Sequence, residues 1–322
     1  MRAVVCRELG PPETLQIEEC DHPLPRPGQV LVDVRAAGVN FVDGLFVAGR
    51  YQIKPPLPFT PGSEVAGVVA DVGDGAGFAA GDRVVAMPGL GGFAEAVVVA
   101  DAQVARLPDN LSFAQGATFM QSYCTALFAL RERAQLQAGE TVLVLGAGGG
   151  VGLAVVDVAR ALGARVIAVA STAEKRAAAE AAGAETSLDP ATDDVKVRAR
   201  ELSDGGVDVV VDPIGGGLAE PALRALGWFG RYLVIGFASG DIPRLPANQM
   251  LLNNRTVLGV DWGAWTMRDP SGHRALLDDA LGLAASGRIT PVAPTEYSFD
   301  DVADALSALL GRRITGKVAL VR

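Results

Sequence analysis

Residues 142–154 read VLVLGAGGGVGLA, a short apolar run that leads into a glycine-rich turn. Gly146, Gly149 and Gly152 have GxxGxxG spacing, and the flanking residues predict a strand before the turn and a helix after it. Glycine lets the backbone turn tightly and lets a ligand approach its N–H groups, and a helix N-terminus attracts anions. We therefore expect the turn to cradle a pyrophosphate. The contacts are expected from Gly146, Gly148, Gly149, Gly150, Val151 and Gly152.

The alternative is a tight turn that only joins a strand to a helix, since glycine spacing alone is a weak signal. The surrounding pattern favours binding, because strands and helices alternate from this point on. The apolar runs are residues 141–146, 164–170, 207–212, 231–236 and 255–260. Strands separated by helices predict a parallel sheet with helices on both faces.

The sequence on either side of this region has a different character. The first third contains short β-branched runs at 31–39, 64–73 and 93–100, punctuated by Gly and Pro. Residues 112–134 offer a Ser cap and an apolar helical stripe. The tail predicts helices over 273–286 and 300–310 and a final strand over 316–321, which is too little for a core of its own. The expected fold class is therefore α/β, with a doubly wound Rossmann sheet and a β-rich domain, and the tail is expected to pack onto one of these two bodies.

Composition excludes several kinds of partner. The chain has 322 residues, enough for two domains, and its net charge of -9 disfavours nucleic acid, which requires a basic face. Its three cysteines are scattered, which suits a reducing compartment. The apolar stretch after residue 142 is shorter than the roughly 20 residues that a membrane span needs. We expect a soluble, cytoplasmic protein with no membrane partner.

The choice of dinucleotide depends on the end of the second strand. NAD-binding units usually carry Asp or Glu there for the ribose 2′-hydroxyl, but this chain has Ser171. Ser171 can donate to a 2′-phosphate, and Lys175 or Arg176 can supply positive charge. The plainer alternative is a Ser or Thr cap on a charged helix, and both can hold together. The pattern favours NADPH over NADH.

Several stretches along the chain carry family motifs, namely residues 36–51, 58–73, 143–171, 211–216, 233–240 and 256–265. Together they resemble the zinc-independent quinone oxidoreductases of the medium-chain dehydrogenase/reductase superfamily, the zeta-crystallin group. The resemblance implies a GroES-like catalytic domain from residues 1–124 and 263–322, and a Rossmann domain from residues 125–262. It also implies NADPH bound in the cleft between them and a homodimer formed through the edge of the Rossmann sheet.

The resemblance also bears on metal. Zinc-dependent relatives carry Cys and His where this chain has Asn40 in GVN and Ser63 in GSE. Neither Asn nor Ser is a good Zn²⁺ ligand, since such a site needs thiolate and imidazole. We therefore expect no metal, and a hydride transfer from NADPH to an acceptor that is already electrophilic, such as a quinone or an enone.

The resemblance assigns the catalytic roles to two residues. It places Asn40 near the nicotinamide ribose and the substrate, and Tyr51 where related enoyl-thioester reductases have a proton-donating tyrosine. The alternatives are a turn residue before a short helix for Asn40 and a loop aromatic for Tyr51. Asp43 is expected to be a residue of the helix N-terminus rather than an acid.

Further site residues follow from the same resemblance and from the ends of the predicted strands. Thr125, Gly236 and Phe237 are expected beside the nicotinamide, and Trp262 and Trp265 in the acceptor pocket. Core packing is the alternative for Thr125 and the aromatic residues. Pro190 stands where many members have a tyrosine that touches the 2′-phosphate, which weakens the NADPH preference.

Three functions remain open at this level. The leading one is an NADPH-dependent quinone reductase. The second is an enone or enoyl-thioester (enoyl-CoA) reductase, which needs a working Tyr51. The third is a non-catalytic NADPH-binding protein.

Overall fold

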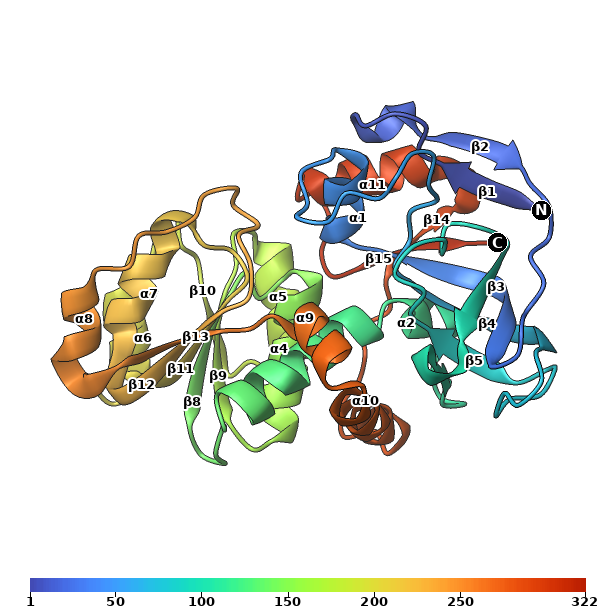
Figure 1. Cartoon of the computed structure of the whole chain (residues 1–322). Helices are drawn as coiled ribbons and strands as arrows, with labels where there is room; N and C mark the ends of the chain where they lie inside the picture. The colour runs from blue at the N-terminus through green and yellow to red at the C-terminus, as the bar shows by residue number, and fades with distance from the viewer. The chain divides into compact units, whose positions relative to one another are not determined.

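Both ends of the chain belong to one structural unit and the middle belongs to another. The computed structural model describes all residues, Met1–Arg322 (Figure 1). Unit 1 comprises Met1–Gln121 and Val292–Arg322, and unit 2 comprises Ser122–Pro291. Residues 122–124 and 263–291 thus lie in unit 2, whereas the resemblance assigned them to the catalytic domain.

Packing within unit 2 explains this difference. Trp265 of α9 (Trp262–Arg268) stacks on Phe128 with 4.6 Å between ring centroids. Asp279 of α10 (Pro270–Ala285) pairs with Arg131 at 2.8 Å. These partners are distant in sequence, so local patterns gave no sign of them.

Unit 2 is built on a six-stranded sheet in the order β10-β9-β8-β11-β12-β13, in which all neighbours are parallel. Its strands are β8 (Thr141–Leu145), β9 (Arg165–Val169), β10 (Thr186–Leu188), β11 (Val207–Asp212), β12 (Leu226–Val234) and β13 (Thr256–Gly259). Leu143 and Leu145 of β8 are fully buried, as expected for a central parallel strand covered on both faces. The predicted α/β fold class is confirmed.

Helices connect these strands. They are α4 (Gly150–Ala161), α5 (Ala173–Ala181), α6 (Val195–Leu202), α7 (Ala219–Ala225) and α8 (Ala247–Leu251), with short 3₁₀ turns at η5 (Gly216–Leu218) and η6 (Leu252–Asn254). No helix of the chain is both long enough and apolar enough to cross a lipid bilayer.

The segment expected to be one helix over 112–134 is divided. Ser112 caps α2 (Phe113–Ala117) as predicted, through a hydrogen bond from the Gln115 N–H at 3.1 Å. Two π-helical stretches, η3 (Met120–Cys124) and η4 (Phe128–Arg133), then flank the short α3 (Thr125–Leu127). The apolar periodicity could not distinguish π turns from α turns, because both keep one face buried.

Asp157 of α4 joins the beginning and the end of unit 2. Its buried carboxylate accepts hydrogen bonds from the Tyr123 hydroxyl at 3.1 Å and from the Thr290 N–H at 2.6 Å, and it pairs with Arg160 at 2.8 Å. One carboxylate therefore fixes the chain just after it enters the unit and just before it leaves.

Unit 1 is β-rich. Its large sheet has the order β14-β15-β3-β4-β5-β7, with β6 paired to β3, and β1 and β2 form a separate pair. The strands are β1 (Arg2–Val5), β2 (Gln16–Glu19), β3 (Gln29–Val39), β4 (Glu64–Val72), β5 (Arg83–Ala86), β6 (Ala96–Ala100), β7 (Val104–Arg106), β14 (Thr295–Ser298) and β15 (Val318–Val321). The helices are α1 (Phe41–Val47) and α11 (Val302–Leu310) besides α2, with 3₁₀ turns at η1 (Pro12–Thr14), η2 (Asp101–Gln103) and η7 (Phe299–Asp301).

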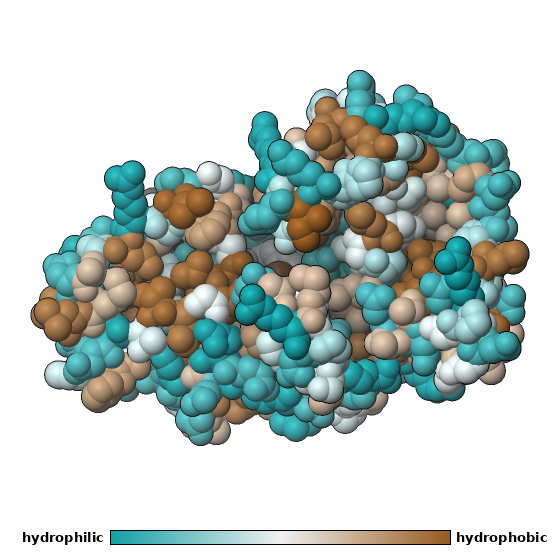
Figure 2. All heavy atoms as spheres, viewed as in Figure 1, coloured by the Kyte–Doolittle hydropathy of each residue, from teal (hydrophilic) through white to brown (hydrophobic).

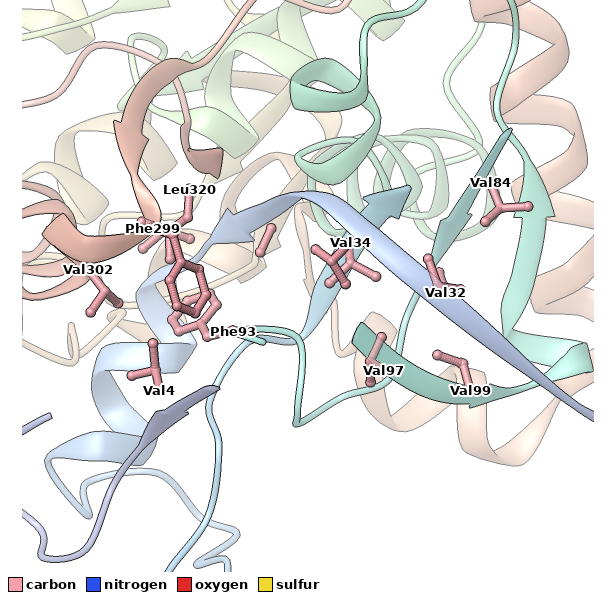
Figure 3. Packing of buried hydrophobic residues seen from close by; sticks show 14 of the residues in the cluster. Val4, Val32, Val34, Val84, Phe93, Val97, Val99, Phe299, Val302 and Leu320 are labelled. Carbon is pink, nitrogen blue, oxygen red and sulfur yellow. The ribbon is translucent and has the colours of Figure 1, made fainter. Parts of the chain in front are cut away.

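The core of unit 1 combines residues from both ends of the chain. Figure 3 shows Phe93 beside Phe299, with Val4 and Val302 close by. Strand β15 runs antiparallel to β3, with Val318 opposite Val39. The end of the chain, Val292–Arg322, is therefore part of this unit, as the resemblance implied.

Candidate functional site

The glycine turn follows β8 and leads into α4. Gly146 has φ of +59°, and a Cβ there would lie 2.5 Å from the Ile214 side chain. A Cβ on Gly152 would lie 2.3 Å from the Gly146 carbonyl oxygen. Gly149 is the N-cap of α4 and provides no side-chain cap. The N–H groups of the first turn therefore have no intrahelical acceptor, and the backbone is bare where an anion would approach.

The end of β9 supplies polar side chains to the same edge. Thr172 caps α5, accepting from the Lys175 N–H at 3.2 Å, so the neighbouring Ser171 is not the cap and is exposed. A Cβ on Gly148 would lie 2.4 Å from the Lys175 Cβ, which shows how closely α5 approaches the glycine turn. Lys175 thus lies against the turn, and the role of Ser171 and Lys175 at a 2′-phosphate stays a prediction.

Arg176 is engaged within unit 2. Its Nη1 donates to the Ala170 carbonyl at 3.1 Å and pairs with Asp189 at 2.8 Å. Asp189 directly follows β10, the strand beside β9. The sequence reasoning missed Asp189 because it looked for an acid only at the end of β9.

A second turn is organised by Asp212 at the end of β11. Its Oδ1 accepts from the N–H groups of Ile214 and Gly215, both at 2.8 Å, and its Oδ2 accepts from the Tyr232 hydroxyl at 2.5 Å. Burial and the Asp212 carboxylate raise the pKa of Tyr232. The hydroxyl therefore remains a donor, and all three partners of the carboxylate are neutral.

The segment after β12 is attached to this turn. The Gly236 N–H donates to the Asp212 carbonyl at 3.4 Å, and a Cβ on Gly215 would lie 3.1 Å from the Phe237 ring. Phe237 is 39% exposed. Because all strands of the sheet are parallel, their carboxyl ends share one edge, where open α/β sheets bind ligands. The glycine turn, Ser171, Asp212 and Gly236 lie along that edge.

Thr125 and Trp262 are buried in unit 2, and Trp265 is half-buried. Thr125 begins α3 between the two π-helical stretches and is 9% exposed. Trp262 is buried and meets His273 edge-on, with 5.4 Å between centroids. Burial lowers the pKa of His273. These contacts are those of packed residues, and the lining roles of Trp262 and Trp265 stay predictions.

Asn40 lies in a buried polar cluster of unit 1. It precedes α1, and its Nδ2 donates to Glu64 Oε1 at 3.0 Å. The Lys317 ammonium donates to Asn40 Oδ1 and to Glu64 Oε1, the latter at 3.1 Å. An ammonium only donates and a carboxylate only accepts, so these partners fix which way the Asn40 amide points.

Ser63 and Gln121 complete the cluster. The Gln121 Nε2 donates to Ser63 Oγ at 2.6 Å, and the Gln121 N–H donates to Glu64 Oε2 at 3.0 Å. The amide and hydroxyl groups of Asn40 and Ser63 are thus engaged in hydrogen bonds within unit 1. No three His, Cys, Asp or Glu side chains of the chain are grouped so as to hold a metal ion.

Asp43 lies beside the cluster in the first turn of α1, the place expected for it. It is fully buried, and its Oδ2 accepts the Asn40 N–H at 2.7 Å while its Oδ1 has no hydrogen-bond partner. Burial raises the pKa of Asp43 to about 7, the nearby Glu64 adds to the shift, and Lys317 opposes it.

Tyr51 follows α1. Its ring meets Phe46 edge-on, with 4.8 Å between centroids, and packs against a small apolar cluster that includes Val47 and Phe59. This packing fixes the ring, and proton donation by its hydroxyl stays a prediction.

Comparison with known proteins identifies the family. The model described as "Alcohol dehydrogenase GroES-like domain" matches residues 26–109, and that described as "Zinc-binding dehydrogenase" matches residues 150–289. "Quinone oxidoreductase-like protein 2" of Bos taurus is 40% identical over 99% of this chain and 92% of the relative. "Quinone oxidoreductase" of Homo sapiens is 36% identical over 100% of this chain and 98% of the relative. The chain belongs to the quinone oxidoreductase family of the medium-chain dehydrogenase/reductase superfamily.

A solved structure of this family has the same fold. The quinone oxidoreductase of Escherichia coli, solved in complex with NADPH, is 29% identical, with a TM-score of 0.89 and full coverage of both chains. Family membership makes the protein an oxidoreductase with a nicotinamide nucleotide cofactor and a small-molecule substrate.

Proposed function

We propose that this quinone oxidoreductase homologue uses NADPH to reduce a quinone by hydride transfer and needs no metal. One observation carries the proposal: the bare glycine turn and the uncapped N-terminus of α4 lie at the edge that also presents Ser171 and Lys175. The E. coli relative solved with NADPH supports the choice of cofactor.

The residues present fit a dinucleotide. Gly146, Gly148 and Gly152 have no room for a Cβ, which would meet Ile214, Lys175 and the Gly146 carbonyl, so only glycine keeps this turn tight enough for its N–H groups to face a ligand. The N–H groups of Gly150, Val151 and Gly152 would hold the pyrophosphate, with Ser171 and Lys175 at the 2′-phosphate. Thr125, Gly236 and Phe237 would hold the nicotinamide end.

The reduced cofactor supplies a hydride, and the protein supplies position and polarity. Lys317 and Glu64 hold the Asn40 amide in one orientation, and the role of Asn40 toward the nicotinamide ribose or the substrate stays a prediction. Asn40 and Ser63 stand where zinc-dependent enzymes have Cys and His, which supports reduction without a metal. A quinone suits such a site because conjugation already makes it electrophilic.

Measuring NADPH oxidation by the full chain against quinones, enones and enoyl-CoA esters tests this proposal. Turnover is expected on quinones. Gly148→Val is the binding-deficient control, since its side chain would meet Lys175. Turnover on enoyl esters alone would favour the enoyl reductase, and stoichiometric NADPH binding without turnover on any acceptor would favour a non-catalytic binding protein.

Tyr51 distinguishes the two reductases. The Tyr51→Phe variant should lose about 10²-fold or more of any enone turnover, as expected for a general acid, and little quinone turnover, because a hydroquinone takes protons from water. Equal rates for variant and parent on both acceptor classes would remove Tyr51 from the mechanism.

We also propose a homodimer formed through the β13 edge of the unit 2 sheet. Strand β13 is a terminal strand of that sheet, and the nearby Leu251 and Leu252 are 79% and 54% exposed. Figure 2 shows apolar residues gathered over α8. Light scattering should give a dimer mass, and Leu251→Lys with Leu252→Lys should shift it toward the monomer. A monomer mass for the parent would contradict this assembly.

A further inference from the structure

The carboxyl ends of β9 and β10 form the corner where the adenosine ribose is expected. The two strands are parallel, with Leu188 opposite Val169, and the Ala170 N–H donates to the Leu188 carbonyl at 3.2 Å. Asp189 directly follows Leu188. Asp189 therefore lies beside the segment that contains Ser171. No acidic residue follows β9 directly, but Asp189 follows the adjacent strand β10.

The carboxylate of Asp189 is fixed in place. Its Oδ1 accepts from the Ala191 N–H at 3.0 Å, and its backbone N–H donates to Asp193 Oδ2 at 2.8 Å. Its Oδ2 pairs with Arg176 at 2.8 Å, and the two side chains are only 24% and 22% exposed. An ion pair that is largely shielded from solvent is weakened less by salt than an exposed one.

Charges of both signs meet at this corner. Lys175 and Arg176 are positive, whereas Asp189, Asp193 and the neighbouring Glu174 and Asp194 are negative. A phosphate monoester carries nearly two negative charges at neutral pH, so a carboxylate beside it opposes its binding. A ribose 2′-hydroxyl is neutral and can donate to a carboxylate, so NADH incurs no such repulsion.

We propose that Asp189 is a specificity-determining residue, whose carboxylate competes with a ribose 2′-phosphate for Arg176 and so narrows the preference for NADPH over NADH. The proposal rests on the proposed use of a nicotinamide dinucleotide at this edge. In this proposal, Ser171 and Lys175 bind the 2′-phosphate, and Arg176 contributes less because it is paired with Asp189.

The test compares dissociation constants of NADPH and NADH for the full chain and two charge-matched variants. Asp189→Asn keeps the acceptor for Ala191 and removes the charge; it should tighten NADPH binding about 5- to 10-fold and leave NADH within about 2-fold, as loss of one nearby repulsive charge predicts. Glu185→Gln is the control. Glu185 pairs with Arg165 at 2.9 Å at the amino ends of the same two strands, so its loss should change neither constant.

A double variant shows whether the effect runs through Arg176. Asp189→Asn combined with Arg176→Met should lose most of the gain for NADPH. The proposal is overturned if Asp189→Asn leaves NADPH binding unchanged or weakens it relative to NADH, or if the double variant keeps the gain. The melting temperature verifies folding, and Asp189→Ser replaces Asp189→Asn if that variant does not fold.

Failure of the proposed function would look different. If the parent chain binds neither nucleotide, the cofactor assignment itself is wrong. If the parent binds both and Asp189→Asn shows no selective gain, only the role of Asp189 is wrong. Adenosine 2′,5′-bisphosphate and 5′-AMP, which lack the nicotinamide, should reproduce the selective gain and confine it to this corner.

Discussion

Two buried carboxylates, Glu64 of unit 1 and Asp212 of unit 2, are compensated in opposite ways. In unit 1, Glu64 has a charged partner, because the Lys317 ammonium donates to it at 3.1 Å. In unit 2, Asp212 has only neutral partners, the Ile214 and Gly215 N–H groups and the Tyr232 hydroxyl. A buried charge needs either an opposite charge or several well-aimed donors. The first solution depends on a residue far away in the chain, and the second depends largely on the turn that the carboxylate itself shapes.

The largest expected effect tests the compensation of Glu64 by a charged partner. Lys317→Met leaves Glu64 buried without its cation, so the free energy of unfolding should fall by about 3–5 kcal/mol, measured by urea denaturation. Lys54→Met, at an exposed position of the same unit, is the control and should cost less than about 0.5 kcal/mol. Equal losses for both variants would mean that Lys317 does not compensate Glu64. Lys317→Met with Glu64→Gln should recover part of the loss.

The next effect concerns Asp43, whose carboxylate has no paired cation and accepts the Asn40 N–H at Oδ2. Its pKa is raised to about 7 in the folded chain from 3.8, so between these values the folded state holds a proton that the unfolded state has released. The contribution of Asp43 to the free energy of unfolding is therefore fully present below pH 4. It is lost as pH rises toward 7, and the free energy of unfolding falls by roughly 2–4 kcal/mol.

Asp43→Asn should remove this dependence. The variant should gain stability relative to the parent as pH rises from 5 to 8, in urea unfolding at each pH. Asp304→Asn, an exposed acid on α11, is the control and should keep the parental profile. A parallel pH profile for Asp43→Asn would show that Asp43 is ionised throughout.

A smaller effect tests the compensation of Asp212 by neutral donors. Tyr232→Phe removes one of the three donors to Asp212, which should cost about 1–3 kcal/mol of stability because a buried oxygen loses its partner. Thermal unfolding measures it, with Tyr297→Phe at a half-buried position as control. A loss as large as that of Lys317→Met would show that a neutral donor and a charged partner matter equally to these buried carboxylates.

The smallest effect is at an exposed cap. Thr172→Ala removes the acceptor of the Lys175 N–H and should cost about 1 kcal/mol, as N-caps usually do. Thr192→Ala, on an exposed turn of the same unit, should cost less. Thermal unfolding gives both values, and a cost at Thr172 no greater than at Thr192 would show that the cap contributes nothing to stability.

Local sequence determined much of this protein. The glycine spacing after β8, the Ser112 cap, the place of Asp43 in the first turn of α1 and the alternation of strands and helices all depend on neighbours within a few residues. Hydrophobic period and turn chemistry act at that range, and they predicted the α/β fold class and the edge that presents the glycine turn.

Only the tertiary structure decided the long-range partners of the buried and half-buried charges. Lys317 meets Asn40 across 277 positions of sequence and Glu64 across 253. Arg176 meets Asp189 through strand pairing, and residues 263–291 join unit 2 through contacts with Phe128 and Arg131. Such pairs leave no periodic signal, because strand order and register bring them together only once the chain has folded.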